Sequence, residues 1–162
     1  MFHALAEAAD ARAWAPTETE PLDLVFIEGF SGATVIGIHD SELHEPQPLV
    51  IDVCAGLPRV RACESDAIAD TLDYGELRER LHRLLREHRV QLLEALAEQV
   101  ARIAIDEFKA HWVRVRVVKP RKFADTAAVG VTIERRRALP PAAAARAAKL
   151  RLIGHGLVPG SQ

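Results

Sequence analysis

The chain has 162 residues, of which 49% are hydrophobic and 27% are charged. Its 21 basic and 23 acidic side chains give a formal charge of −2, which excludes the strongly basic balance typical of nucleic-acid-binding domains. This size predicts one domain with a real core, and no apolar run approaches the ~20 residues that a membrane helix needs. Cys54 and Cys63 lack a CxxC spacing and no segment resembles a signal peptide, so we expect a cytoplasmic protein with reduced thiols.

The predicted organisation is one central domain between two ends of biased composition. Residues 1–21 are Ala-rich and acidic and finish in a polar run, which indicates an N-terminal extension. Residues 22–137 form the predicted domain. Residues 138–162 are rich in Ala, Pro and basic side chains, which indicates a C-terminal tail, and the sequence assigns it no function.

The domain opens with a predicted β-hairpin. From Leu22 to Ile38 a β-branched pattern predicts one long strand, bent by a kink at the glycines Gly29 and Gly32. Residues 49–57 alternate in polarity and predict a returning antiparallel strand. The segment between the two strands is therefore the hairpin loop.

Two histidines and three carboxylates lie within seven consecutive positions of this loop. A metal site needs three or more converging ligands, and the spacing here matches no known metal-binding motif. We therefore expect no metal site and prefer a solvated hairpin loop, unless another observation distinguishes one of its carboxylates. The candidate residues of the loop are His39, Asp40, Glu42, His44 and Glu45.

Two helices and two further strands complete the predicted domain. Asp73 and Glu76 resemble a capping box that opens a helix, and a second helix is predicted over residues 91–108. Strands are predicted over residues 112–119 and 129–136. The order ββααββ, with short connections, predicts an α+β fold in which both helices cover one face of an antiparallel sheet.

One strand carries a lysine on its apolar row. Three valines share a face of the 112–119 strand with Lys119, while two arginines lie on the other face. At the rim of the core, partial desolvation would lower the pKa of Lys119 toward the range useful for proton transfer. The alternative is that its ammonium reaches water while its stem covers the core.

Two more side chains are candidates with ordinary alternatives. Glu94 lies in the first turn of the second helix, where a carboxylate commonly interacts with the helix dipole. Pointed inward, it could instead accept two parallel N–H bonds from an amidine-like ring edge. Tyr74 is the single tyrosine, and it is either a half-buried packing residue or a proton donor with a neighbouring base.

Six stretches of the domain together resemble the dihydroneopterin aldolases of folate biosynthesis. The spacings from Glu42 to Tyr74, Glu94 and Lys119 match that family without insertion or deletion. The stretches are Val25–Glu28, Ile36–Glu42, Ser65–Asp70 with Leu72–Tyr74, Leu92–Glu94, Val117–Pro120 and Val129–Arg135.

The resemblance implies a fold and an assembly. That family has the tunnelling fold (T-fold), whose ββααββ sheets join side by side into a barrel around a channel. Two tetrameric rings stack as a homo-octamer. Pairing between subunits would then satisfy the open edges of the sheet, and the row of two arginines would face the channel.

The resemblance also implies roles. Lys119, Tyr74 and Glu42 match catalytic residues, with Tyr74 reaching the pocket from a neighbouring subunit. Glu94 and Leu93, with Glu42 and Tyr74, match the residues that bind the pterin substrate. The implied reaction is the retro-aldol cleavage of 7,8-dihydroneopterin, with no metal or other cofactor, and with epimerisation at C2′ in many members.

Two alternatives remain beside the aldolase. The loop after Lys119 carries Arg121, Lys122 and a Phe-Ala-Asp run also seen in dihydroneopterin triphosphate 2′-epimerases, and its cations could attract a phosphate or simply solvate the loop. A non-enzymatic pterin-binding paralogue is disfavoured because all four polar site positions are occupied.

Overall fold

The computed structural model describes residues 21–138, so the predicted extension and tail lie outside the described residues except for Pro21 and Ala138. Its main strands and helices follow the predicted order ββααββ. The elements are β1 (Asp23–Thr34), η2 (Asp40–Glu42), β2 (Gln47–Leu57), α1 (Ala62–Ser65), η3 (Ile68–Asp70), α2 (Tyr74–Glu87), α3 (Leu93–Arg102), η4 (Ile103–Glu107), β3 (Trp112–Phe123) and β4 (Thr126–Arg136).

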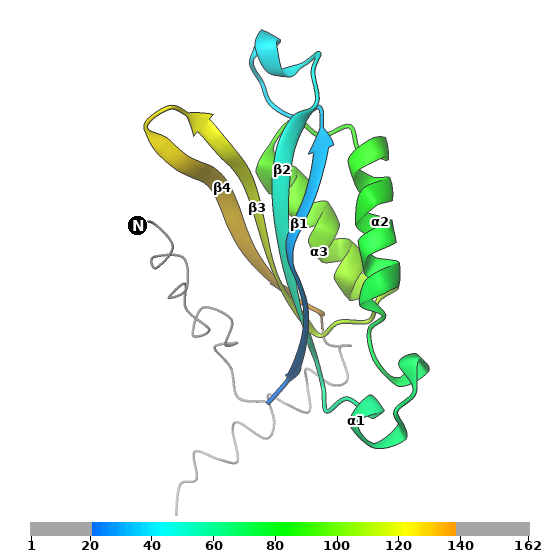
Figure 1. The fold of residues 1–162 in the computed structure, drawn as a ribbon. Coiled ribbons are helices and arrows are strands. Elements are labelled where there is room, and N and C mark those ends of the chain that lie inside the picture. The colour runs from blue at the N-terminus through cyan, green and yellow to red at the C-terminus, as the bar shows by residue number, and fades with distance from the viewer. Residues whose placement is uncertain (1–20, 139–162) are drawn as a thin grey trace, which may run out of the picture.

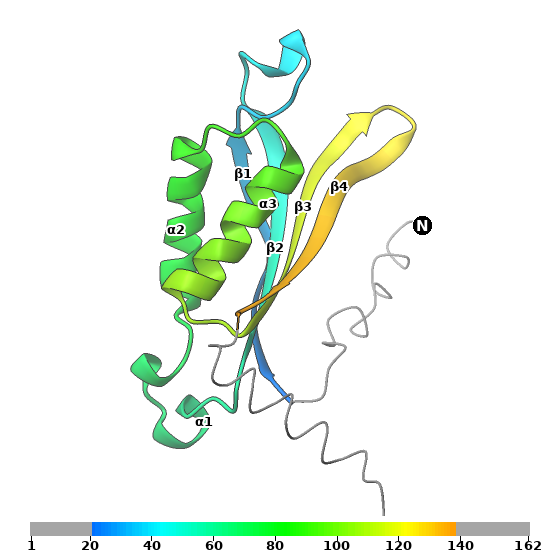
Figure 2. The same ribbon diagram turned by 180° about the vertical axis from the view of Figure 1, so that it is seen from behind.

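The strands form one antiparallel sheet in the order β1-β2-β3-β4 (Figure 1). Seen from behind, α2 and α3 lie side by side across the same face of this sheet (Figure 2). The valine row of β3 is fully buried against them, with Val113, Val115 and Val117 each 0% exposed. The predicted α+β arrangement and the inward direction of that row are therefore confirmed.

Strand β1 is bent where the glycines predicted a kink. Its pairing with β2 shifts between Ile27 and Phe30, and Gly29 has a positive φ of 69°. The amide of Gly29 leaves the ladder and donates to Asp52 Oδ1 at 2.7 Å. The bend is thus a β-bulge whose free amide is bonded by a carboxylate of the neighbouring strand.

The prediction that this strand continues to Ile38 was wrong, because β1 ends at Thr34. Beyond Thr34 the backbone bonds to side chains. The carbonyl of Ile36 accepts from Gln47 Nε2 at 3.1 Å and from Lys119 Nζ at 2.9 Å. Since those groups satisfy the backbone without a partner strand, the chain can turn away from the sheet.

Both helices bury a leucine-rich or alanine-rich stripe. Helix α2 begins after Asp73, whose Oδ1 accepts from the amides of Gly75 (2.8 Å) and Glu76 (3.0 Å), as a helix cap should. The second helix starts later than predicted, at Leu93, and residues Ile103–Glu107 form the π-helical turn η4. The residues buried by the two helices are Leu77, Leu81, Leu84, Leu85, Leu96, Ala97, Val100 and Ala101.

No helix within residues 21–138 is both long enough and apolar enough to cross a lipid bilayer.

Candidate active site

Three segments distant in sequence meet at one end of the sheet. They are the loop between β1 and β2, the start of α3, and the end of β3 where it turns into β4, all at the upper end of Figures 1 and 2. Between them lies a pocket of about 310 Å³, within the usual range for small-molecule sites. Its lining includes four of the five predicted site residues, namely Glu42, Leu93, Glu94 and Lys119.

Lys119 is buried at the rim of the core, with 8% of its surface exposed. Its Nζ donates to Glu42 Oε1 at 2.8 Å and to the carbonyl oxygen of Ile36 at 2.9 Å. The alternative in which its ammonium reaches into water is therefore wrong. A buried amine beside a pocket has the position that a proton-transfer group needs.

Glu42 is the carboxylate that the loop singles out, since it is only 4% exposed. Its Oε1 accepts from Lys119 and Lys122, and its Oε2 accepts from the amides of Ile38 (3.2 Å) and His39 (3.4 Å). The hydrogen bond from Lys119, and next that from Lys122, lower the pKa of Glu42 from 4.5 to about 2, although burial opposes the shift. Glu42 is thus a carboxylate at neutral pH.

The other titratable residues of the loop are exposed, and the described part of the chain contains no group of three His, Cys, Asp or Glu side chains that could hold a metal ion. The prediction that one carboxylate differs from its neighbours is confirmed. The exposed residues are His39, Asp40, His44 and Glu45.

Gly37 allows Glu42 to fold back over the loop. Its φ is +144°, and an added Cβ would lie 2.6 Å from the Cβ of Glu42. We expect Gly37→Ala to lower the free energy of unfolding by about 1–3 kcal/mol and to displace Glu42. Urea denaturation measures the loss. Gly29→Ala is the matched control, because Gly29 also has a positive φ but nothing within 4 Å of the added Cβ. An equal loss in both variants would contradict the packing argument.

The pKa of Glu42 predicts an acid dependence of stability. Because the folded value lies below the ordinary one, the charged carboxylate stabilises the fold at neutral pH, and this contribution falls as the pH drops from about 4.5 to about 2. We expect the unfolding free energy of the wild type to fall more steeply than that of Glu42→Gln, by up to about 1.4 kcal/mol per pH unit. Urea titrations between about pH 5 and 3 measure both slopes; parallel slopes would refute the assignment.

The first turn of α3 forms the second wall of the pocket. Leu93 is half-buried and packs against the core, whereas Glu94 is exposed. Within residues 21–138 no hydrogen bond or ion pair engages the Glu94 side chain. Its carboxylate is therefore available both to the helix dipole and to a ligand. The structure is compatible with both interpretations of Glu94.

Tyr74 is the predicted site residue that the chain does not bring to this pocket. It lies in the first turn of α2, at the opposite end of the sheet from the loop that holds Glu42 (Figure 1). It is 65% exposed, so the packing alternative, in which it is half-buried, was wrong. A single chain therefore cannot place Tyr74 beside Lys119.

Sequence reasoning missed the contact that Lys122 makes. The side chain of Lys122 lines the pocket, and its ammonium donates to Glu42 Oε1. The sequence suggested only that this lysine could attract a phosphate or solvate the loop. Strand periodicity gave no signal for the contact, because alternation places Lys119 and Lys122 on opposite faces.

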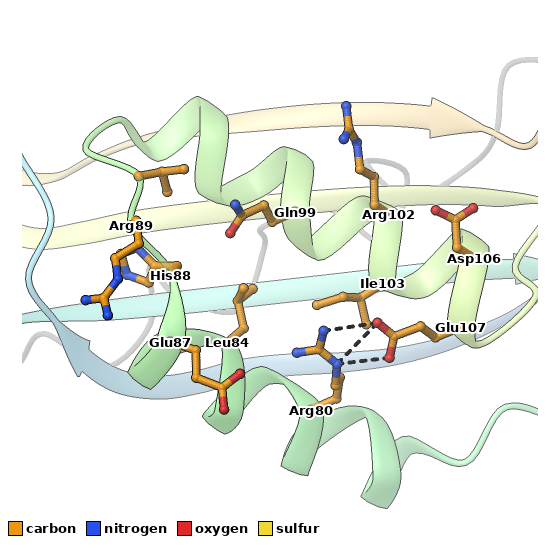
Figure 3. A pocket seen from close by; sticks show the side chains of 11 residues that line it. Arg80, Leu84, Glu87, His88, Arg89, Gln99, Arg102, Ile103, Asp106 and Glu107 are labelled. Carbon is orange, nitrogen blue, oxygen red and sulfur yellow. Dashed lines mark hydrogen bonds and ion pairs between the residues drawn. The ribbon is translucent and has the colours of Figure 1, made fainter.

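A larger pocket of about 530 Å³ lies between α2 and the segment formed by α3 and η4 (Figure 3). Arg80 and Glu107 face each other across it, and Arg80 Nε donates to Glu107 Oε2 at 2.9 Å. None of the predicted site residues lines this pocket. Size alone would favour it, but the buried lysine and carboxylate assign the smaller pocket as the candidate site.

Comparison with known proteins agrees with this fold. The matching family model, described as FolB, dihydroneopterin aldolase, spans residues 25–134. Dihydroneopterin aldolase of Escherichia coli (strain K12) is 39% identical over 114 residues, which are 70% of this chain and 93% of that protein. The crystal structure of the E. coli enzyme in complex with neopterin matches with a TM-score of 0.67 and 38% identity, over 70% of this chain and 99% of that one.

A second group of relatives is less similar to this chain than the E. coli aldolase is. Dihydroneopterin triphosphate 2′-epimerase of E. coli (strain K12) is 31% identical over 94 residues, which are 58% of this chain and 76% of that protein. Both the identity and the matched length are lower than for the E. coli aldolase. The T-fold expected from the sequence is confirmed by the structural match, and the chain belongs to the dihydroneopterin aldolase family.

Proposed function

We propose that this chain is the dihydroneopterin aldolase of folate biosynthesis, a lyase that cleaves 7,8-dihydroneopterin into 6-hydroxymethyl-7,8-dihydropterin and glycolaldehyde. The observation that carries the proposal is the buried pair of Lys119 Nζ and Glu42 Oε1, 2.8 Å apart, in a pocket of about 310 Å³. A retro-aldol cleavage needs a base for a hydroxyl proton, and Lys119 is the buried amine in the lining of this pocket.

The proposed chemistry only moves protons. Lys119, directly or through water, removes the proton of the C2′ hydroxyl, and the C1′–C2′ bond breaks as C2′ becomes the aldehyde carbon of glycolaldehyde. The bonding electrons pass to C1′ and are taken up by the adjacent C=N of the dihydropterin ring, which gives an enamine. Protonation at C1′, assisted by Tyr74, then yields the hydroxymethyl product.

The ring itself supplies the electron sink in this scheme, so we propose that neither a metal nor another cofactor takes part. EDTA should therefore leave the rate unchanged. Re-addition of glycolaldehyde to the same enamine would give epimerisation at C2′ as a side activity.

Substrate recognition is assigned to the first turn of α3. The Glu94 carboxylate, which no side chain of residues 21–138 engages, accepts two parallel N–H bonds from the amino-pyrimidinone edge of the pterin. Leu93 packs alongside the ring, and Glu42 contacts the substrate side chain. The neopterin in the E. coli crystal structure supports a pterin as the ligand class.

We propose a cytoplasmic homo-octamer of two tetrameric rings, each chain contributing a domain over residues 22–137. Two features support this assembly. Strands β1 and β4 are the open edges of the sheet, which a neighbouring subunit could extend, and the helices cover only one of its faces. Exposed Tyr74, at the far end of each chain from Lys119, would then complete a neighbour's pocket.

The decisive experiment follows glycolaldehyde release from 7,8-dihydroneopterin by the purified full-length chain. Stoichiometric release of glycolaldehyde and 6-hydroxymethyl-7,8-dihydropterin is expected. Binding of neopterin without any release would instead identify a pterin-binding paralogue and refute the aldolase.

The triphosphate 2′-epimerase is the second candidate, because one group of relatives carries that activity. Assaying 7,8-dihydroneopterin triphosphate in parallel distinguishes the two. We expect the unphosphorylated substrate to give the higher kcat/KM, because the ammonium of Lys122 is bonded to Glu42 and is not free for a phosphate. A preference for epimerising the triphosphate would reverse the assignment.

A further inference from the structure

Lys122 reaches the pocket because strand β3 is irregular. In a regular strand, residues three apart face opposite sides, so Lys122 would point away from Lys119. The pairing with β4 slips by one residue between Pro120 and Phe123, and Arg121 between them has a positive φ of 50°. This bulge turns the side chain of Lys122 onto the face that carries Lys119.

The two lysines share one oxygen. Lys119 Nζ lies 2.8 Å from Glu42 Oε1, and the ammonium of Lys122 donates to the same atom. Lys119 is the more deeply buried, with 10% of its side chain exposed against 27% for Lys122. Two positive charges and one negative charge therefore meet at a single carboxylate oxygen, which leaves the cluster with an excess positive charge.

This excess charge favours loss of one proton from the two ammonium groups. The position of Lys122 determines what happens to Glu42 when Lys119 is the group that loses it. When Lys119 becomes neutral, Glu42 still has a cation beside it, so no carboxylate is left uncompensated in a buried place. Without Lys122, loss of the Lys119 proton would leave the buried Glu42 carboxylate without a counter-ion, so Lys119 would hold its proton more tightly. The other titratable side chains that line the pocket are His39 of the loop and Glu94 of α3, while β4 contributes only Val129, Gly130 and Val131.

We propose that Lys122 is a positioning residue for the proposed aldolase reaction, serving as the alternate counter-ion of Glu42 so that Lys119 becomes available as a neutral base. The inference rests on the proposed function for its role in turnover. The charge relation among the three side chains stands independently of any reaction.

The first test is the pH profile of kcat for glycolaldehyde release by Lys122→Met. The acid limb should move to higher pH by about one unit, because a like charge within a few ångströms has been removed. Lys122→Arg should restore the wild-type profile, since it keeps the positive charge. Arg121→Met, which removes an exposed cation one residue away, is the matched control and should leave the profile in place.

A purely structural role for Lys122 predicts something different. If it only holds Glu42 in position, Lys122→Met would lower kcat at every pH while the midpoint of the acid limb stays unchanged. An unchanged midpoint, with or without a lower kcat, overturns the proposal.

A second readout does not depend on turnover. Only a neutral amine reacts with acetic anhydride, so the extent of Lys119 acetylation as a function of pH, measured by peptide mass spectrometry, reports its protonation. The midpoint should lie about one unit higher in Lys122→Met than in the wild type. If the wild type releases no glycolaldehyde, the proposed function fails, yet this comparison still supports the charge relation or, with equal midpoints, refutes it.

Discussion

Replacing Lys119 with methionine should lower the kcat for glycolaldehyde release by about 10²–10⁴-fold, the usual contribution of a general base. Methionine has nearly the length of lysine and fills the same buried space without an amine. Glu42 keeps Lys122 as its ion-pair partner, so we expect the variant to fold. Because we assign recognition of the ring to Glu94, neopterin binding measured by fluorescence should change much less than kcat.

The matched control for this substitution is Lys109→Met. Lys109 is exposed, and its ammonium bonds to the carbonyl of Asp106; it follows η4, whereas the pocket lies at the start of α3. Its kcat should equal that of the wild type. If Lys119→Met were folded, bound neopterin and still cleaved the substrate at the wild-type rate, the base would have to be another group.

A mixture of two inactive variants should recover activity if each active site is shared between subunits. Lys119→Met and Tyr74→Phe would each be nearly inactive alone, since each lacks one of the two proposed proton-transfer groups. After joint refolding, a site is complete when one chain supplies Lys119 and its neighbour supplies Tyr74. Random mixing of equal amounts makes about one site in four complete, so we expect about a quarter of the wild-type rate.

The control for this mixing experiment pairs Lys119→Met with Glu94→Ala. Both residues line the pocket of the same chain, so no combination of these two variants can restore a site that lacks one of them. The rate of glycolaldehyde release by this mixture should equal the mean of the rates of the two separate variants. No recovery with the first pair would show that Tyr74 is not supplied by a neighbouring subunit.

The arrangement of the fold was predictable because it follows from local patterns. Two examples are the alternation of valines in residues 113–117 and the capping residue Asp73. Each depends only on residues that are close by in the sequence. They determined strand order, helix positions and the face on which Lys119 lies. The end of β1 was not predictable in this way, because the carbonyl of Ile36 bonds to Lys119, 83 residues later in the chain.

The environment of the site also depends on distant contacts. Whether Lys119 reaches water or is buried was decided by Glu42, a partner 77 residues away that no periodicity could place. The contact of Lys122 required the bulge at Arg121, which arises from the register with β4 rather than from the residues of β3 alone. The resemblance to a family suggested the candidate residues, but not the ion pairs that they form.

The early end of β1 also makes the site observable without a substrate. The amides of Ile38 and His39 are bonded to Glu42 Oε2 instead of to a strand, so their exchange with deuterium tracks whether that carboxylate is in place. A ligand that draws Glu42 away would release both amides together. These two backbone amides are therefore an intrinsic reporter, within the loop, of whether the Glu42 carboxylate has left its buried position.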